Sequence, residues 1–180
     1  MFATPAQCLA RPTAHGLARE FRRFGAPGAE GRLPCRRSRD RSVGGPMVLN
    51  QCAVRMSVAL CRSMNDDIFG PYDGGLHSDQ CCAGPVPCRH ISSAQTLFRH
   101  LQRKLGFAFE RLATGAAGIS GRKGIVFFDD VFIRRNGTAG DHIDFWDGRT
   151  YTNEATGAGA PTGDLPMFDD ARRGVWFCQL

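Results

Sequence analysis

The chain has 180 residues, of which 42% are hydrophobic and 22% charged, as is ordinary for a soluble globular protein. No apolar run approaches the roughly 20 residues that cross a membrane, and the N-terminus lacks the apolar core of a secretory signal. The net charge of +6 comes entirely from residues 1–46, where nine arginines face three acidic residues. A nucleic-acid-binding role would therefore depend on that segment alone, since the remainder of the chain is neutral.

The first 46 residues are rich in Arg, Ala, Pro and Gly and show little apolar periodicity. Such a composition is typical of disordered segments, so we predict a tail over residues 1–46 without catalytic chemistry, which could target, tether or bind acidic partners. Met47 opens a more regular region, and a working protein that starts there is an alternative. One domain is assigned to residues 47–180.

Two helices are expected in the first half of this domain. Residues 50–63 have the apolar spacing of a mostly buried helix, with Asn50 as the N-cap. Residues 65–90 contain Gly, Pro, Asp and paired Cys, and we predict a long loop there. Ser92 or Ser93 can cap a second helix over residues 93–105, with leucines on one face and a basic, solvated face opposite.

Strands follow the helices. Residues 124–128 (GIVFF) predict a short buried strand, and residues 141–146 alternate His, Asp and Trp with Ile and Phe. Asp147-Gly148 is a strong hairpin signal that leads into residues 150–152, and residues 175–178 predict a last strand. Helices first and antiparallel strands afterwards indicate an α+β fold.

Eight cysteines are many for a reduced domain and few for a disulfide scaffold. Cys61 and Cys178 lie in apolar runs that predict core packing. Three more share a Gly/Pro-rich loop, where two of them can form a disulfide in an oxidising compartment: Cys81, Cys82 and Cys88.

Neither a metal site nor a phosphate loop is well supported. The loop cysteines and His90 would be the ligands of a zinc site, but adjacent cysteines chelate one tetrahedral ion poorly and a second CxxC pair is missing. Residues 115–124 (GAAGISGRKG) lack the GxxxxGK[ST] spacing, so we predict a flexible loop. No metal and no cofactor are expected.

The first candidate for chemistry is Cys52, at the start of the predicted helix 50–63. There, free backbone N–H groups and the positive end of the helix dipole would stabilise a thiolate. A thiolate nucleophile needs a basic partner, and His142 on a predicted strand can supply it. The residues alone also allow a simpler interpretation, in which Cys52 packs in the core and His142 is a surface residue.

The imidazole of His142 would need an acceptor for its other ring nitrogen. Asp144 shares its face, but side chains two apart on one strand are separated by roughly 7 Å. Asn153 follows the predicted turn, and a hairpin can bring it alongside His142. On this geometry Asn153 is the favoured acceptor.

Five segments occur in an order that resembles a known family: NQCAVRMSVAL, CRHISSAQTLFRHL, GRKGIVFF, HIDFWDG and GVWFC. Together they resemble the type VI secretion amidase effectors of the fourth family, which are NlpC-like, papain-like cysteine peptidases. The resemblance implies a nucleophilic cysteine at a helix N-terminus packed on an antiparallel sheet, here Cys52, and a strand histidine, here His142. The third member, usually an aspartate eleven residues later, is Asn153 in this sequence.

The resemblance also implies a reaction, the hydrolysis of the γ-D-glutamyl–diaminopimelate bond in peptidoglycan stem peptides. Cys52 would attack the carbonyl carbon, with its own backbone N–H as an oxyanion donor. His142 would protonate the leaving amine and then activate water. Asp144 and Trp146 are either substrate contacts or a structural pair.

Family resemblance further implies delivery by the type VI tube and spike into the periplasm of a rival cell, without a signal peptide. The producer's cytoplasm would hold the protein before delivery, and a cognate immunity protein would block its active site there. A disulfide among the loop cysteines would form only after delivery. Two other functions stay open: an inactive cell-wall-binding module on the same fold, and a nucleic-acid binder that uses the basic tail.

Overall fold

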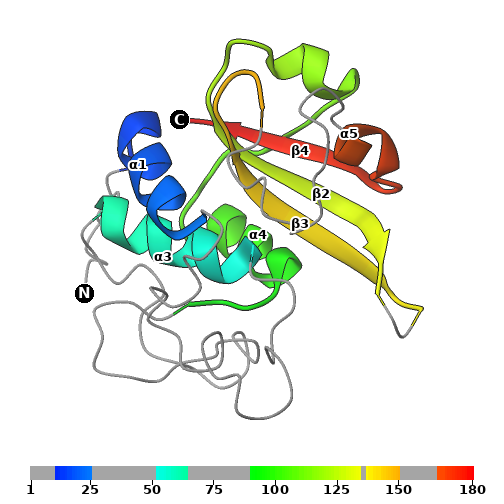
Figure 1. Ribbon diagram of the computed structural model, residues 1–180, viewed down its shortest axis with the longest axis horizontal. Helices are drawn as coiled ribbons and strands as arrows, with labels where there is room; N and C mark the ends of the chain where they lie inside the picture. The colour runs from blue at the N-terminus through cyan, green and yellow to red at the C-terminus, as the bar shows by residue number, and fades with distance from the viewer. Residues whose placement is uncertain (1–10, 26–51, 65–89, 135–136, 151–165) are drawn as a thin grey trace, which may run out of the picture.

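The computed structural model describes residues 11–25, 52–64, 90–134, 137–150 and 166–180, and three of its described helices precede all of the described strands (Figure 1). The elements in chain order are α1 (Ala14–Gly25), α3 (Cys52–Met64), α4 (Ala94–Arg103), β1 (Glu110–Arg111), the 3-10 helix η2 (Gly115–Ile119), β2 (Gly124–Ile133), β3 (Ala139–Trp146), α5 (Pro166–Asp170) and β4 (Gly174–Gln179). This arrangement confirms the predicted α+β class. None of the described helices is long and apolar enough to cross a membrane.

The sheet has the strand order β1-β4-β2-β3, and every pair is antiparallel. β2 lies between β4 and β3, so that Ile125 is opposite Cys178 on one side and Phe145 on the other. Its first five residues are all buried, which a run of Ile, Val and Phe allows because both faces of the sheet are covered. The strand is longer than predicted because it continues through an irregularity in the register between Phe128 and Phe132.

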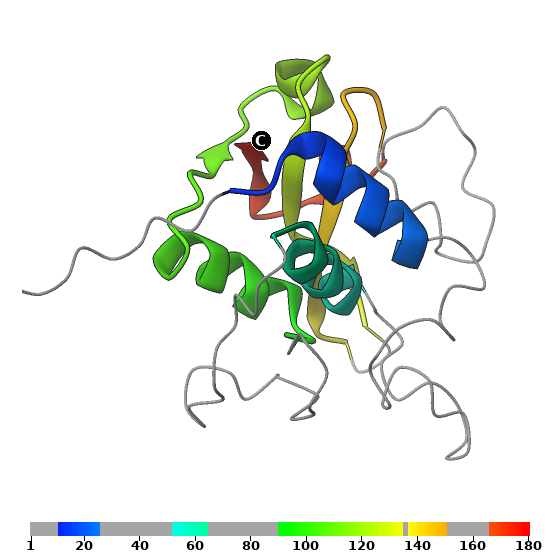
Figure 2. The ribbon, with the colours of Figure 1, turned by 90° about the vertical axis from the view of Figure 1, so that its left-hand side faces the viewer.

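Alternate residues of the strands enter two separate hydrophobic clusters, one on each face of the sheet. Helices α1, α3 and α4 cover one face (Figure 2), where Phe98 of α4 stacks on Phe127 with ring centroids 4.2 Å apart. The 3-10 helix η2 and α5 cover the other face. There Trp146 meets Phe168 edge-on, with centroids 5.6 Å apart. The catalytic candidates on β3 are thus held in a sheet that is packed on both sides.

Helix α1 corrects the predicted tail. Leu17 and Phe21 are fully buried, and α1 packs against α3. Thr13 caps the helix, because its hydroxyl accepts a hydrogen bond from the N–H of Gly16 at 3.1 Å. Arg11 ties the segment to the domain by donating to the carbonyl of Gly106 at 2.8 Å. The prediction of disorder is therefore wrong for residues 11–25, and the rest of the predicted tail lies outside the described residues.

Helix α4 agrees with its predicted caps and faces. Ser93 is the N-cap and accepts a hydrogen bond from the N–H of Thr96 at 3.2 Å. Leu97 and Leu101 are fully buried, while the basic residues of the opposite face are exposed, as predicted: Arg99, Arg103 and Lys104. This face is the solvated side of an amphipathic helix.

The segment predicted as a flexible loop before β2 is ordered instead. η2 buries Ile119 completely, and the carbonyl of Ile119 accepts a hydrogen bond from the Trp146 indole N–H at 3.0 Å. Arg122 is also engaged: its guanidinium pairs with Glu110 and Gln179 and lies over the Phe177 ring. The prediction failed because these partners are distant in sequence.

Candidate active site

Cys52 is the first residue of α3, as the predicted helix start required. The helix is buried from Cys52 to Cys61, and it packs against β3. At this end of α3 the backbone N–H groups have no partners within the helix, and the helix dipole is positive. The thiol is free and only 3% exposed, so it lies at the N-terminal end of α3 inside the domain.

His142 lies on β3, opposite Phe128 in the register with β2, and is 5% exposed. Among the described residues the imidazole has two polar partners. Its Nε2 is 3.1 Å from Oδ2 of Asp144, and the side chain of Cys52 lies within hydrogen-bonding reach of the ring. The structure therefore brings together the predicted cysteine and histidine, which are 90 positions apart in the chain.

The electrostatics of His142 favour its protonated form. Burial alone lowers the pKa of an imidazole, but here the negative charge of the Cys52 thiolate and the hydrogen bonds with Asp144 and Cys52 outweigh it. The net effect raises the pKa of His142 to about 10. The environment therefore stabilises the imidazolium form of His142, which is the form that can donate a proton to a leaving amine.

Asp144 is fully buried, and both of its carboxylate oxygens are used. Oδ1 accepts a hydrogen bond from the N–H of Phe145 at 2.7 Å, and Oδ2 meets the imidazole of His142. The argument that two residues on one strand are too far apart fails here, because the side chains lean toward each other along the strand. Asn153, the acceptor favoured on sequence grounds, lies outside the described residues.

Trp146 is 1% exposed and packs within the sheet's second hydrophobic cluster. With Asp144 it had been a candidate substrate contact or a structural pair. Both side chains are buried and have separate partners, His142 for Asp144 and the Ile119 carbonyl for Trp146, so a contact of either with substrate stays a prediction. Burial of an indole with its N–H hydrogen-bonded is a common way to anchor a strand.

The other described cysteines differ from each other. Cys178 is free and buried, as predicted, and burial raises the pKa of its thiol. Cys61 is buried as predicted, but it is also disulfide-bonded, which its apolar surroundings did not indicate. The predicted disulfide among Cys81, Cys82 and Cys88 lies outside the described residues.

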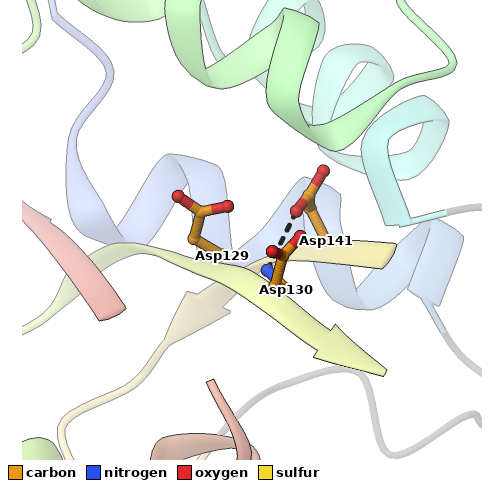
Figure 3. Close-up of side chains that lie close together, drawn as sticks. All are labelled: Asp129, Asp130 and Asp141. Carbon is orange, nitrogen blue, oxygen red and sulfur yellow. Dashed lines mark hydrogen bonds between the residues drawn. The ribbon is translucent and has the colours of Figure 1, made fainter. Parts of the chain in front are cut away.

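Three carboxylates, Asp129, Asp130 and Asp141, form a cluster that the sequence analysis did not identify (Figure 3). One oxygen from each lies within 4.8 Å of the others. Asp130 has a positive φ of 56°, and its N–H donates to Oδ1 of Asp141 at 3.0 Å. The adjacent acidic pair in FFDDVF was the available signal, but only the β2–β3 pairing adds Asp141.

Carboxylate oxygens suit Ca²⁺ or Mg²⁺, so these are the described side chains that could hold a cation. Arg173 already provides a positive charge, since its Nε is 2.7 Å from Oδ2 of Asp130. Burial and the neighbouring carboxyls raise the pKa of Asp129. Arg173 offsets part of the negative charge of this cluster.

Comparison with known proteins gives the family. The family model for type VI secretion system (T6SS) amidase effector protein 4, Tae4, matches residues 48–177, most of the chain. The chain belongs to the Tae4 family. It is an amidase effector of type VI secretion, an enzyme that acts on peptidoglycan. A search of curated proteins finds no match.

Solved Tae4 structures share the fold. The Tae4–Tai4 effector–immunity complex from Enterobacter cloacae matches with a TM-score of 0.63 at 17% identity, covering 94% of this chain and 98% of that one. The Tae4/Tai4 system from Salmonella typhimurium matches with a TM-score of 0.66 at 16% identity, covering 94% and 98%. These matches confirm the predicted papain-like fold, and they extend N-terminal to residue 48, into the segment that holds α1.

Proposed function

We propose that this Tae4 protein is a DL-endopeptidase that cleaves the γ-D-glutamyl–diaminopimelate bond of peptidoglycan stem peptides through Cys52 and His142. The observation that carries the proposal is that the side chains of Cys52, the first residue of α3, and His142 on β3 meet inside the domain. Membership in the amidase effector family supplies the reaction class, and the resemblance of the motifs supplies the bond.

In the proposed reaction the Cys52 thiolate attacks the γ-glutamyl carbonyl carbon and forms a tetrahedral intermediate. The backbone N–H of Cys52, at the start of α3, would donate to the oxyanion. His142 then gives its proton to the diaminopimelate amine, which leaves as the acyl-enzyme forms. Water, deprotonated by His142, attacks the thioester and releases the glutamyl product and the free thiol.

The third member of the site remains the sequence prediction, Asn153. An amide oxygen can accept a hydrogen bond from the imidazole and hold its tautomer, although it carries no charge to stabilise an imidazolium. The aspartate usual at this position would supply that charge.

The family also supports a proposal on partners and location. The solved relatives are effector–immunity complexes of Tae4 with Tai4, so we propose that a cognate immunity protein binds this chain and blocks Cys52 in the producing cell. We also propose delivery by the type VI tube and spike into the periplasm of a target cell, where the substrate lies.

The test is digestion of diaminopimelate-type peptidoglycan by the full chain, with the released fragments identified by mass. The wild type should release products that end at γ-D-glutamate, and Cys52→Ala and His142→Ala should lose at least about 1,000-fold in rate. Cys178→Ala is the matched control, since it removes another free, buried cysteine.

Other results would change the assignment. Products cut at a different bond would refute the endopeptidase specificity but retain the amidase. No release by a folded wild-type protein would support the inactive cell-wall-binding module. Equal loss in Cys178→Ala and Cys52→Ala would show that the assay reports on folding.

A further inference from the structure

We infer that Asp144 is the positioning residue of this site: its buried carboxylate holds the His142 imidazole and supplies the negative charge that Asn153 lacks. The inference rests on the proposed roles of Cys52 and His142. It deepens them by assigning the hydrogen-bond acceptor of the imidazole to Asp144, on the same strand as His142, and not to Asn153.

The first support is the way in which the carboxylate is aimed. Oδ1 of Asp144 is fixed by the N–H of Phe145 at 2.7 Å, which sets the orientation of the carboxylate. Oδ2 is then directed at Nε2 of His142, 3.1 Å away. One oxygen is held by the backbone and the other by the imidazole, so the pair is rigid before substrate binds.

The second support is the burial of Asp144, which is 0% exposed. A carboxylate away from water costs several kcal/mol unless a positive group pairs with it. Among the groups that act on the imidazole in the described residues, the charged ones are Cys52 from α3 and Asp144 from β3; β2 contributes only the Phe128 ring. A positive charge on His142, 3.1 Å away, therefore offsets the buried negative charge of Asp144.

The third support is the assignment of the ring nitrogens. A carboxylate only accepts, so Nε2 of His142 carries a proton and donates it to Asp144. Nδ1 is then the nitrogen left for Cys52. It takes the proton from the Cys52 thiol, passes it to the nitrogen of the leaving amine, and takes one from water during deacylation. Nε2 keeps its proton throughout, and the carboxylate of Asp144 acts only as its acceptor.

This arrangement explains how the chain can carry a neutral residue at position 153. The amide of Asn153 has no charge whatever its placement, whereas the carboxylate of Asp144 is in hydrogen-bond contact with the ring. We therefore expect the stabilisation of the imidazolium to depend on Asp144 and only weakly on Asn153.

The experiment compares Asp144→Asn with Asn153→Ala and with wild type in the full chain. Three quantities are measured: the pH dependence of peptidoglycan hydrolysis, the pH dependence of Cys52 alkylation by iodoacetamide, and the titration of His142 by 15N-histidine NMR. Asp144→Asn should move the His142 titration to lower pH by about one unit or more and reduce hydrolysis about 100-fold or more. Asn153→Ala should leave the titration in place and reduce hydrolysis less than about tenfold.

The inference is overturned if Asn153→Ala lowers the His142 titration and Asp144→Asn does not. If Asp144→Asn fails to fold, the decision rests on wild type and Asn153→Ala: a His142 titration that falls when Asn153 is removed refutes the inference, and an unchanged one supports it. The alkylation and NMR measurements use no peptidoglycan, so they test Asp144 independently of the proposed reaction. If wild type is inactive but Asp144→Asn still lowers the pH of the His142 titration, the role of Asp144 is supported and the proposed endopeptidase activity is refuted.

Discussion

Replacing Phe21 by Ala should destabilise the whole domain, although this residue lies in the Arg-rich segment before residue 47. Its side chain is 0% exposed and packs in the same hydrophobic cluster as Cys52 and Phe127. Truncation of a buried Phe to Ala costs about 3–5 kcal/mol, because both the transferred surface and the residual cavity count. Against a typical total of about 5–15 kcal/mol, that is a large share of the stability.

The assay is urea unfolding of the full chain, followed by the fluorescence of its two tryptophans. Phe21→Ala should lower the midpoint strongly with little change in slope, and Leu17→Ala should cost about 2–5 kcal/mol for the same reason. His15→Ala, at an exposed position of the same helix, should stay within about 0.5 kcal/mol of wild type.

An unchanged midpoint in Phe21→Ala would refute this reasoning. It would show that α1 is not part of the folding unit and would restore the boundary at residue 47. The complementary result is expected from truncation: residues 47–180 alone should unfold at a lower urea concentration than the full chain.

Three further changes probe the rest of the fold. Ser57→Ala should cost about 1–3 kcal/mol in urea unfolding, because the buried hydroxyl bonds both the N–H of Ile91, at 3.2 Å, and its carbonyl, at 3.4 Å; Ser63→Ala is a less buried control, and equal losses would contradict the argument. The pKa of Asp129 is higher in the folded state than its ordinary value of 3.8, so the ionised carboxylate destabilises the folded state at neutral pH. This destabilisation disappears when the pH falls below 3.8, because the carboxyl is then protonated in both states. Asp129→Asn should therefore raise the free energy of unfolding at pH 7 by less than about 1 kcal/mol and change little at pH 3; a lower stability at pH 7 would refute this. Gly124→Ala should be more damaging than Gly140→Ala in thermal melting. The added Cβ would collide with the backbone carbonyl of Cys178 at position 124, but with the movable Phe132 ring at position 140. A second substitution, Phe132→Leu, should restore the melting temperature of Gly140→Ala but not that of Gly124→Ala. Restoration of Gly124→Ala would contradict this account of the two collisions.

Elements governed by local chemistry could be predicted from the sequence. The Ser93 cap and the leucine spacing of α4 act within a few residues, and so does the aromatic run that opens β2. Cys52 at a helix start and His142 on a strand were recognised for the same reason, since each position depends on its own segment.

The remaining features depend on partners far away in the sequence. In α1, Leu17 and Phe21 are fully buried among arginines. The Arg-rich composition therefore hides a helix whose stability comes from packing on α3. The cluster of Asp129 and Asp141 exists only because β2 and β3 pair.

Sequence by itself determined the secondary structure around Cys52 and His142 and the family to which they point. Only the tertiary structure decided which groups surround the imidazole: a thiol from α3 on one side and, from two residues along its own strand, the carboxylate of Asp144. The physical reason is that the sequence gives the spacing of the Cα atoms along a strand but not the direction of the side chains. A buried carboxylate is stable only where it pairs with a hydrogen-bond donor or a positive charge, and the position of such a partner depends on the tertiary structure.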